Sequence, residues 1–506
     1  MTHLLGVDLG TTAVKAALFD ACGKRVASAT QEYALKTPAP LMVEQEVAVY
    51  WGAFRDALAA VLAAGRVPPR WIRALGISAQ GETLIAIDRR GDPLAPAIVW
   101  MDNRAQRESE DLAACLGDAR VHEATGQVRM LPMWPASKIL WLRRNRVEVF
   151  RQVYKFLLLE DYFLYRLTGR FVAEGSLLCS TTYWELRTKR YWKAMLEQLE
   201  IGEEMLPEVV EPGQLIGRIR PEAAEELGLA PETLITTGAL DQACGALGVG
   251  NLKPGIFSEC TGSNVAVVAL VDRPRIDLRR ELPCFYYALP DTYMMHAFSM
   301  TGGMILRWFR DGFCGEAMQE AAASGTDSYD LLTREAAGVP AGAEGLALLP
   351  HFQGAGLPES NPLARGVLYG LTLHHTRAHV LRAILESIAM TCRRMIEAMR
   401  DLGIEVSEVR CLGGGAKSAL WCQIKADLTG LPVVTMRNTE DAACLGAAVL
   451  AGAATGVWES AAEALSRIVQ TDRRFEPDPG RRDEYERLYA TYRLLYDSLL
   501  PVFNRR

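Results

Sequence analysis

Apolar residues gather in short runs of strand length along the first hundred residues, separated by glycine-containing and charged turns. These runs predict strands at Leu4–Asp8, Ala13–Phe19, Ala74–Ser78, Leu84–Asp88 and Ala97–Trp100. The segment Val47–Ala64 differs, because its large apolar residues recur at steps of three and four and so predict a helix. A hairpin followed by helix-linked strands predicts a mixed α/β sheet covered by helices.

The rest of the chain repeats this organisation after a segment, residues 103–230, that we expect to be mostly helical. A second strand-rich region begins near Leu234–Gly238 and contains a hairpin, Gly255–Cys260 with Asn264–Val271. A glycine turn with a hydroxyl side chain therefore occurs once in each half, which is weak evidence for a duplicated domain. Further predicted elements are helix Arg377–Arg400, strand Val409–Leu412, helix Ala419–Leu428 and a buried helix of small residues at Ala442–Ala454.

Length and composition exclude several classes of protein. The chain has 506 residues, which is too long for one hydrophobic core, and its net charge of −6 with no basic block argues against nucleic-acid binding. No uninterrupted apolar run reaches the ~18 residues of a membrane span, and no signal pattern opens the chain. Eleven scattered cysteines without a Cys-x-x-Cys pair favour reduced thiols and a cytoplasmic location. The histidine cluster His374, His375 and His379 we interpret as structural, with a zinc site as the alternative.

The first hairpin carries candidate chemistry at its turn. Gly10 permits a tight turn and close approach of a ligand, and the hydroxyls of Thr11 and Thr12 can donate to phosphate oxygens. Asp8, at the end of a buried strand, is placed to hold Mg²⁺. The alternative is an ordinary hairpin with a polar tip.

Two further motifs follow predicted strands later in the chain. Asp241, after a buried strand and among small residues, could accept a proton from a substrate hydroxyl, or could simply cap a helix. The triple glycine 413–415 between a strand and a helix would let a base or ribose lie against the backbone, although its spacing is not the dinucleotide fingerprint. The alternative for the glycines is a flexible turn.

Polar residues at two strand ends suit a small polyhydroxylated substrate. Gln80 and Glu82 follow one strand, and Trp100 and Asp102 follow another, where open α/β sheets place their ligands. The alternative is a surface loop with a packed tryptophan.

The order of these motifs resembles the FGGY family of carbohydrate kinases, within the actin/sugar-kinase/Hsp70 superfamily, from about Leu4 to about Ala454. The motifs are Asp8-Leu-Gly-Thr-Thr, Gln80 with Glu82, Ile98 to Arg104, Gly238-x-x-Asp241, Thr261-Gly262-Ser263, Ala364-Arg365-Gly366, Arg377 to Ala383, and Gly413 to Ser418 with Trp421. The resemblance implies an α/β fold of two actin-like, ribonuclease H-like domains, each a mixed sheet flanked by helices, with an ATP and substrate cleft between them.

The resemblance also implies roles for individual residues and a pair of cofactors, ATP and Mg²⁺. Asp241 would be the general base in an in-line transfer from ATP. Asp8 and Asp241 would hold the metal. Substrate would be bound by Gln80, Glu82, Trp100, Asp102, Asp241 and Gln242. The nucleotide would be bound by Asp8, Gly10, Thr11, Thr12, Lys15, Thr261, Gly262, Gly302, Gly303, Gly413, Gly414, Gly415 and Ser418.

The substrate is less well indicated than the reaction. The chain looks most like the xylulokinase-like members, so a pentulose such as D-xylulose is expected. However, those members usually carry Met-His-Gly after the glutamine, whereas this chain has Gly81-Glu82-Thr83; glycerol kinases carry Arg-Glu-Thr. We interpret Gly81 as leaving room for a substrate larger than a triose. Alternatives are ribulose, gluconate, erythritol or a glycerol-like polyol, a non-kinase actin- or Hsp70-like ATPase, and an inactive paralogue, which the presence of both Asp8 and Asp241 disfavours.

The predicted organisation is an N-terminal domain over residues 1–246, a C-terminal domain over 247–485 and a helical tail over 486–506. The expected partners are ATP and a sugar, with no nucleic acid and no membrane, and a homodimer is one option for the assembly. The segment with Glu174, Ser176, Cys179 and Ser180 matches the family's pattern poorly, so no site is assigned there.

Overall fold

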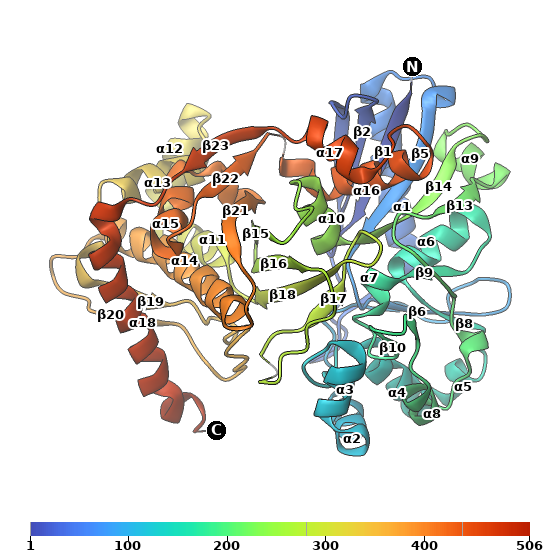
Figure 1. The fold of residues 1–506 in the computed structure, drawn as a ribbon, viewed down its shortest axis with the longest axis horizontal. Helices are drawn as coiled ribbons and strands as arrows, with labels where there is room; N and C mark the ends of the chain where they lie inside the picture. Colours follow the sequence, from blue (N-terminus) through green and yellow to red (C-terminus); the bar gives the residue numbers. More distant parts are fainter. Residues whose placement is uncertain (1, 280, 438, 506) are drawn as a thin grey trace. The chain divides into compact units, whose positions relative to one another are not determined.

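The computed structural model describes residues 2–279, 281–437 and 439–505 (Figure 1). The chain divides into two compact units, each made from separated segments. The first unit contains Met1–Leu252, Leu270–Met294 and Asp441–Val469. The second unit contains Lys253–Ala269, Met295–Glu440 and Gln470–Arg506.

The first unit is built on a six-stranded sheet in the order β13-β14-β5-β1-β2-β3. Its strands are β1 (His3–Leu9), β2 (Ala13–Asp20), β3 (Arg25–Glu32), β5 (Ile72–Ala79), β13 (Leu215–Arg218) and β14 (Leu234–Leu240). Strand β1 pairs antiparallel with β2 and parallel with β5, and β5 pairs parallel with β14. The predicted hairpin and the two following parallel strands are thereby confirmed.

The second unit repeats this pairing. Its sheet contains the order β18-β16-β15-β21-β22-β23, formed by β15 (Gly255–Thr261), β16 (Val265–Val271), β18 (Tyr293–Ser299), β21 (Val406–Leu412), β22 (Val433–Met436) and β23 (Thr471–Phe475). Strand β15 pairs antiparallel with β16 and parallel with β21, and β21 pairs parallel with β22. The shared series of one antiparallel and two parallel pairings supports the duplication inferred from the two glycine turns.

A helix of small residues explains why a late segment of the chain belongs to the first unit. Helix α16 (Ala442–Ala454) packs against β1, β5 and β14. An added Cβ at Gly6 would lie 1.8 Å from the carbonyl oxygen of Cys444, and one at Gly76 would lie 2.3 Å from that of Ala447. Because glycine lets the helix approach the sheet this closely, residues 441–469 pack with the first unit rather than with the contiguous 247–485 domain that we predicted.

Helix α1 (Val47–Gly65), predicted over Val47–Ala64, has the length and hydropathy of a membrane-spanning helix. It contains Arg55 and Asp56, and it packs against β2 and β3. The core helix of a folded domain meets the same criteria, so this helix gives only weak evidence for a membrane.

Residues 103–230 are less helical than predicted. The segment contains α2 (Gln106–Leu116), α3 (Asp118–Thr125), α4 (Pro135–Asn145), α5 (Val147–Phe150), α6 (Leu159–Thr168), α7 (Gly175–Leu178), α8 (Lys193–Leu199) and α9 (Pro221–Leu227). It also contains β8 (Lys155–Leu158), β9 (Val172–Glu174), β10 (Trp184–Glu185), β11 (Arg190–Tyr191) and β12 (Glu208–Val210), besides β13. Strand β8 completes a small sheet, β4-β7-β6-β8, with β4 (Glu44–Gln45), β6 (Leu84–Ile87) and β7 (Ala97–Ile98). These strands are short enough that their apolar residues cannot be distinguished from buried helix by periodicity alone. Strand β7 was also predicted imprecisely, because it ends at Ile98, two residues before the predicted end at Trp100.

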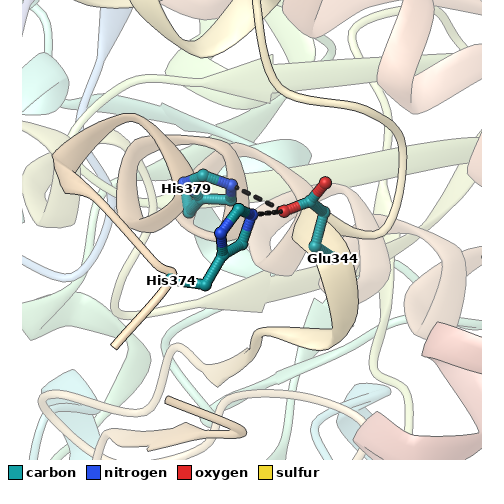
Figure 2. A group of neighbouring side chains, drawn as sticks. All are labelled: Glu344, His374 and His379. Carbon is teal, nitrogen blue, oxygen red and sulfur yellow. Dashed lines mark hydrogen bonds and ion pairs between the residues drawn. The ribbon is translucent and has the colours of Figure 1, made fainter. Parts of the chain in front are cut away.

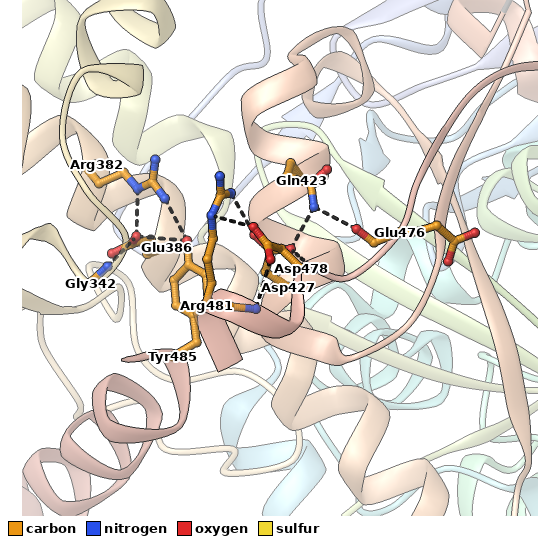
Figure 3. A network of polar contacts seen from close by, with 10 residues as sticks. Gly342, Arg382, Glu386, Gln423, Asp427, Glu476, Asp478, Arg481 and Tyr485 are labelled. Carbon is orange, nitrogen blue, oxygen red and sulfur yellow. Dashed lines mark hydrogen bonds and ion pairs between the residues drawn. The ribbon is translucent and has the colours of Figure 1, made fainter. Parts of the chain in front are cut away.

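Helices on the second unit's sheet are joined by polar contacts. They include α14 (Arg377–Asp401), α15 (Ala419–Thr429) and α18 (Arg482–Phe503), which begins four residues before the predicted tail. Arg382 donates to Glu386 over 2.7 Å and to the Tyr485 hydroxyl over 2.7 Å (Figure 3). Arg481, just before α18, pairs with Asp427 of α15 over 3.0 Å. These contacts fix the C-terminal helix to α14 and α15.

Candidate active site

The first hairpin turn places Asp8 beside a hydroxyl of the neighbouring strand. Asp8, the penultimate residue of β1, accepts a hydrogen bond of 2.7 Å from the Ser78 hydroxyl on β5. Burial raises the pKa of Asp8, while the Ser78 hydrogen bond opposes this shift. The turn itself is closed by the Gly10 N–H, which donates to Ala13 over 3.0 Å.

The turn is connected to two residues predicted to bind substrate. The Trp100 indole N–H donates to the Thr11 hydroxyl over 2.8 Å. The Gln80 side-chain amide donates to the Gly10 carbonyl over 3.1 Å. Thr12 remains exposed. The side chains that we predicted to bind the sugar therefore lie against the turn that we predicted to bind phosphate.

Asp241 is the first residue of helix α10 (Asp241–Gly248), directly after β14. Its carboxylate accepts the N–H of the next residue, Gln242, over 2.6 Å. The N-cap position is Leu240 and no side chain caps the helix, so the capping alternative was wrong. Burial, with the negative charges of Asp8 and Glu82, raises the pKa of Asp241 to about 8. The carboxyls of Asp8 and Glu82 therefore lie close enough to Asp241 to disfavour its charged form. Carboxylate oxygens are ligands that fit a hard cation such as Mg²⁺.

Glu82 has a buried cation as its neighbour. Lys138 of α4 is fully buried and donates to the carbonyls of Glu82 over 2.8 Å and Val99 over 3.0 Å. Burial raises the pKa of Glu82 and lowers that of Lys138, and the attraction between the two charges opposes both shifts. Sequence reasoning missed Lys138, because a lysine in an amphipathic helix is ordinarily exposed.

Our interpretation of Gly81 as open space for a larger substrate was wrong. An added Cβ at Gly81 would lie 3.1 Å from Leu240 and 3.3 Å from the Ser180 hydroxyl. The volume next to Gly81 is therefore already filled by protein.

Two predicted site residues are engaged with other side chains. Both carboxylate oxygens of Asp102 accept hydrogen bonds from Arg104, at 2.7 and 2.9 Å, and one also accepts the Val43 N–H over 2.6 Å. Lys15 pairs with Asp441 over 3.2 Å. A substrate role for Asp102 and a nucleotide role for Lys15 stay predictions, since each group already has a structural partner.

Buried acids hold the strand that leads to Asp241. Glu160 accepts the Gly238 N–H over 2.8 Å, and the Ser176 hydroxyl accepts the Leu240 N–H over 2.8 Å. Ser176 in turn donates to Glu174 over 2.7 Å. Burial raises the pKa of both glutamates. The segment with Glu174 and Ser176, to which we assigned no site, thus supports the strand that leads to the predicted general base. Its only signal in the sequence was the presence of acidic residues within an apolar run.

In the second unit, the predicted glycines pack on the turn after β15. An added Cβ would lie 2.7 Å from the Thr261 carbonyl oxygen at Gly413 and 2.7 Å from the Thr261 Cβ at Gly415. Gly413 has φ +77°, which favours glycine. Gly302 is likewise confined, because its added Cβ would lie 2.4 Å from Asn264. These close approaches bring motifs separated by more than a hundred residues into one site.

A cavity of about 370 Å³ opens at this turn. Six of the predicted nucleotide residues line it: Thr261, Gly262, Gly303, Gly414, Gly415 and Ser418. The remaining lining includes Met304, Leu306, Arg307, Asp327, Tyr329, Asp330, Thr333, Lys417 and Trp421. Its size and its mixed apolar and polar lining suit a nucleotide. Gly302 and Gly413 lie behind this lining.

A buried ion pair supports the same turn from behind. The ammonium group of Lys425 lies 2.6 Å from the Glu259 carboxylate and 3.0 Å from the Thr261 hydroxyl. Thr261 donates to the other oxygen of Glu259. Both charged side chains are almost fully buried. The pair fixes the Thr261 side chain, and no sequence pattern predicted it.

Comparison with known proteins agrees with this geometry. The N-terminal domain of the FGGY family of carbohydrate kinases matches residues 3–248, and the family's C-terminal domain matches residues 270–455. A gluconokinase of Bacillus subtilis (strain 168) is 30% identical over 504 residues, covering 99% of this chain and 95% of the relative. A xylulose kinase of the same organism is 28% identical, covering 98% of this chain and 97% of the relative.

Solved structures give the same result for the fold. A ligand-bound xylulose kinase from Lactobacillus acidophilus superimposes with a TM-score of 0.89 at 27% sequence identity, covering 99% of this chain and 98% of the other. The two-domain, actin-like fold predicted from the order of motifs is confirmed. The chain belongs to the FGGY family of carbohydrate kinases.

Proposed function

We propose that the protein transfers the terminal phosphate of ATP to a hydroxyl of a small neutral sugar, with a pentulose such as D-xylulose as the first candidate. FGGY kinases use ATP, so the open questions are the acceptor and the residues that act. The observation that carries this proposal is the buried carboxyl of Asp241, whose pKa is raised in part by Asp8 and Glu82, together with the contacts of Gln80 and Trp100 to the turn after Asp8.

The charges of these carboxyls favour a neutral acceptor over a sugar acid. A carboxylate ligand such as gluconate would add a further negative charge near Glu82 and Asp241. The nearby cation Lys138 already donates to two main-chain carbonyls. A ketose or polyol would meet the same groups as a hydrogen-bond donor, without charge repulsion.

Asp241 then acts as the general base. Burial and the neighbouring carboxyls raise the pKa of Asp241 to about 8, so its carboxylate form, which bound Mg²⁺ would favour, is a stronger base than an ordinary aspartate and can accept the hydroxyl proton. As that proton moves to the Asp241 carboxylate, the sugar oxygen forms a bond to the γ-phosphorus and the bond from the γ-phosphorus to the bridging oxygen of ADP breaks. Thr11 and Thr12 donate hydrogen bonds to phosphate oxygens during the transfer.

Asp8, oriented by Ser78, would hold Mg²⁺ together with Asp241. When bound, the ion neutralises phosphate charge that these carboxylates would otherwise repel.

The assignment is tested by measuring ADP release with D-xylulose, D-ribulose, erythritol, glycerol and D-gluconate. We expect the highest kcat/KM for D-xylulose. A preference for D-gluconate would overturn the neutral-acceptor argument and leave the kinase assignment intact. No sugar-dependent ADP release with any acceptor would contradict phosphoryl transfer to this class of substrate. A cytoplasmic location and a homodimer stay predictions.

A further inference from the structure

Glu344, His374 and His379 bring one carboxylate and two imidazoles together in the second unit (Figure 2). Glu344 lies in a short turn, η3 (Ala343–Gly345), His374 precedes α14, and His379 lies in the first turn of α14. The Nε2 atoms of His374 and His379 lie 2.6 and 3.1 Å from the same Glu344 oxygen. None of the three lines the nucleotide cavity, so the cluster is not explained by the proposed reaction.

The backbone beneath Glu344 is strained. Ala343 and Glu344 have φ values of +45° and +53°, in the left-handed region that residues with a Cβ rarely adopt. The turn is held by the Gly342 N–H, which donates to buried Glu386 over 3.0 Å. Such strain persists only where the surroundings fix it, and here it directs the Glu344 carboxylate toward the two rings.

The ring of His379 is held at its other nitrogen by Thr376. Its Nδ1 accepts the Thr376 N–H over 3.1 Å in the capping box of α14 and lies 2.9 Å from the Thr376 hydroxyl oxygen. When Nδ1 carries the proton and donates it to that hydroxyl oxygen, Nε2 presents a lone pair toward Glu344. The Thr376 N–H is near the surface and can then bond to water. A second ring nitrogen held by a protein oxygen is the usual arrangement around metal-bound histidine.

We propose that Glu344, His374 and His379 bind a divalent transition-metal ion of the Zn²⁺ class, with water as the fourth ligand. Two imidazole nitrogens and a carboxylate oxygen suit Zn²⁺, whereas Mg²⁺ and Ca²⁺ prefer sets made of oxygens. Tetrahedral ligands at ~2.0–2.1 Å from the ion are separated by roughly 3.3 Å, so only a small movement of the exposed His374 is needed. The ion links the strained turn to the start of α14.

The test is a calorimetric titration with ZnCl2 of full-length protein without an affinity tag, after treatment with a chelator. Cys22 and Cys115 are exposed thiols, and thiols are zinc ligands, so the titration uses a Cys22→Ser, Cys115→Ser background. We expect one saturable equivalent, weakened by ~10-fold or more in His374→Ala and in Glu344→Gln. Both positions are exposed, so neither change threatens folding.

The matched control is His375→Asn in the same loop, which removes an imidazole but none of the three ligands. Its zinc affinity should stay within ~3-fold of the parent, well below the change expected for removal of a ligand. Co²⁺ should give the visible absorption of a tetrahedral site in the parent and the His375 variant, and not in His374→Ala. Absence of saturable zinc binding, or binding that His374→Ala leaves unchanged, would overturn the proposal.

Discussion

The two units have the same strand pairing but place different residues at the ends of their strands. In the first unit, β1, β5 and β14 lead to Asp8, Gln80 and Asp241. In the second, the corresponding β15 and β21 lead to Thr261 and to the glycines 413–415. One topology therefore supplies a group of acids and amides in one unit and, in the other, the cavity with glycines in its lining to which we assign the nucleotide.

The two units also contain buried acids that are stabilised in different ways. In the second unit, Glu259, Glu386 and Asp427 pair with Lys425, Arg382 and Arg481. In the first unit, three buried acids form no ion pair with any described residue and have raised pKa values that favour their protonated forms: Glu160, Asp161 and Glu174. Fixed charge pairs suit a binding scaffold, whereas groups that exchange protons suit the side of the reaction where a proton moves.

The largest effect is expected for Asp241→Ala. Removal of the proposed general base should lower kcat by ~10³-fold in sugar-dependent ADP release. Asp56→Ala, on the surface of α1, is the matched control and should retain parental turnover. Undiminished turnover in Asp241→Ala would remove the catalytic role from the first unit.

Lys425→Met tests the fixed pair of the second unit. The change leaves the Glu259 carboxylate buried without its cation, so denaturant unfolding should show a loss of about 3–5 kcal/mol. The KM for ATP should rise, because Thr261 loses a neighbour that orients its hydroxyl. The double variant Glu259→Leu, Lys425→Met should regain much of the stability, and a double variant as unstable as the single one would show that the charges do not act as a pair.

The variants Glu160→Gln and Glu259→Gln compare the stability lost at a buried acid that favours its protonated form with the stability lost at a buried acid paired with a cation. Glu160 uses one oxygen for Gly238 and has no hydrogen-bond partner on the other, so an amide can replace it at a cost below ~1 kcal/mol. Glu259→Gln leaves Lys425 without its counter-ion and should cost about 3 kcal/mol or more. Equal losses of unfolding free energy would contradict the distinction between the units.

A change of pH is expected to have a smaller effect on the melting temperature. The pKa values of Asp161 and Glu174 are raised to about 7 and about 8, above those of unfolded acids, so the folded protein binds more protons. Their contribution to stability is therefore complete below the unfolded pKa and is lost as pH rises through the folded values. The melting temperature should fall by a few degrees between about pH 5.5 and about pH 8.5. Asp161→Asn should flatten this dependence, and a melting temperature that rises over the same range would contradict it.

Much of the fold was predictable because its sheet strands are buried and strongly apolar. The runs at Leu4–Asp8, Ala74–Ser78 and Leu234–Gly238 all became central strands. Strand β3 was missed, since its residues alternate between partly and fully exposed and carry few apolar side chains. Edge strands of this kind leave little pattern in a sequence.

Site residues that directly follow a strand could be predicted from the sequence. Residues whose role depends on a buried contact with a distant part of the chain could not. Asp8, Gln80 and Asp241 could be identified from position and chemistry. Lys425 and Glu259 could not, because 166 positions separate them and only the fold brings them together. The same holds for Glu160, whose contact with Gly238 spans 78 positions.

The central claim is that the second unit binds the nucleotide while Asp241 of the first performs the chemistry. It is tested most directly by calorimetric titration of the inactive Asp241→Ala variant with a non-hydrolysable ATP analogue. The account predicts an affinity within ~3-fold of the parent, because the cavity lined by Thr261, Gly414 and Ser418 contains no atom of Asp241. A weakening comparable to the loss of turnover would contradict this division of roles.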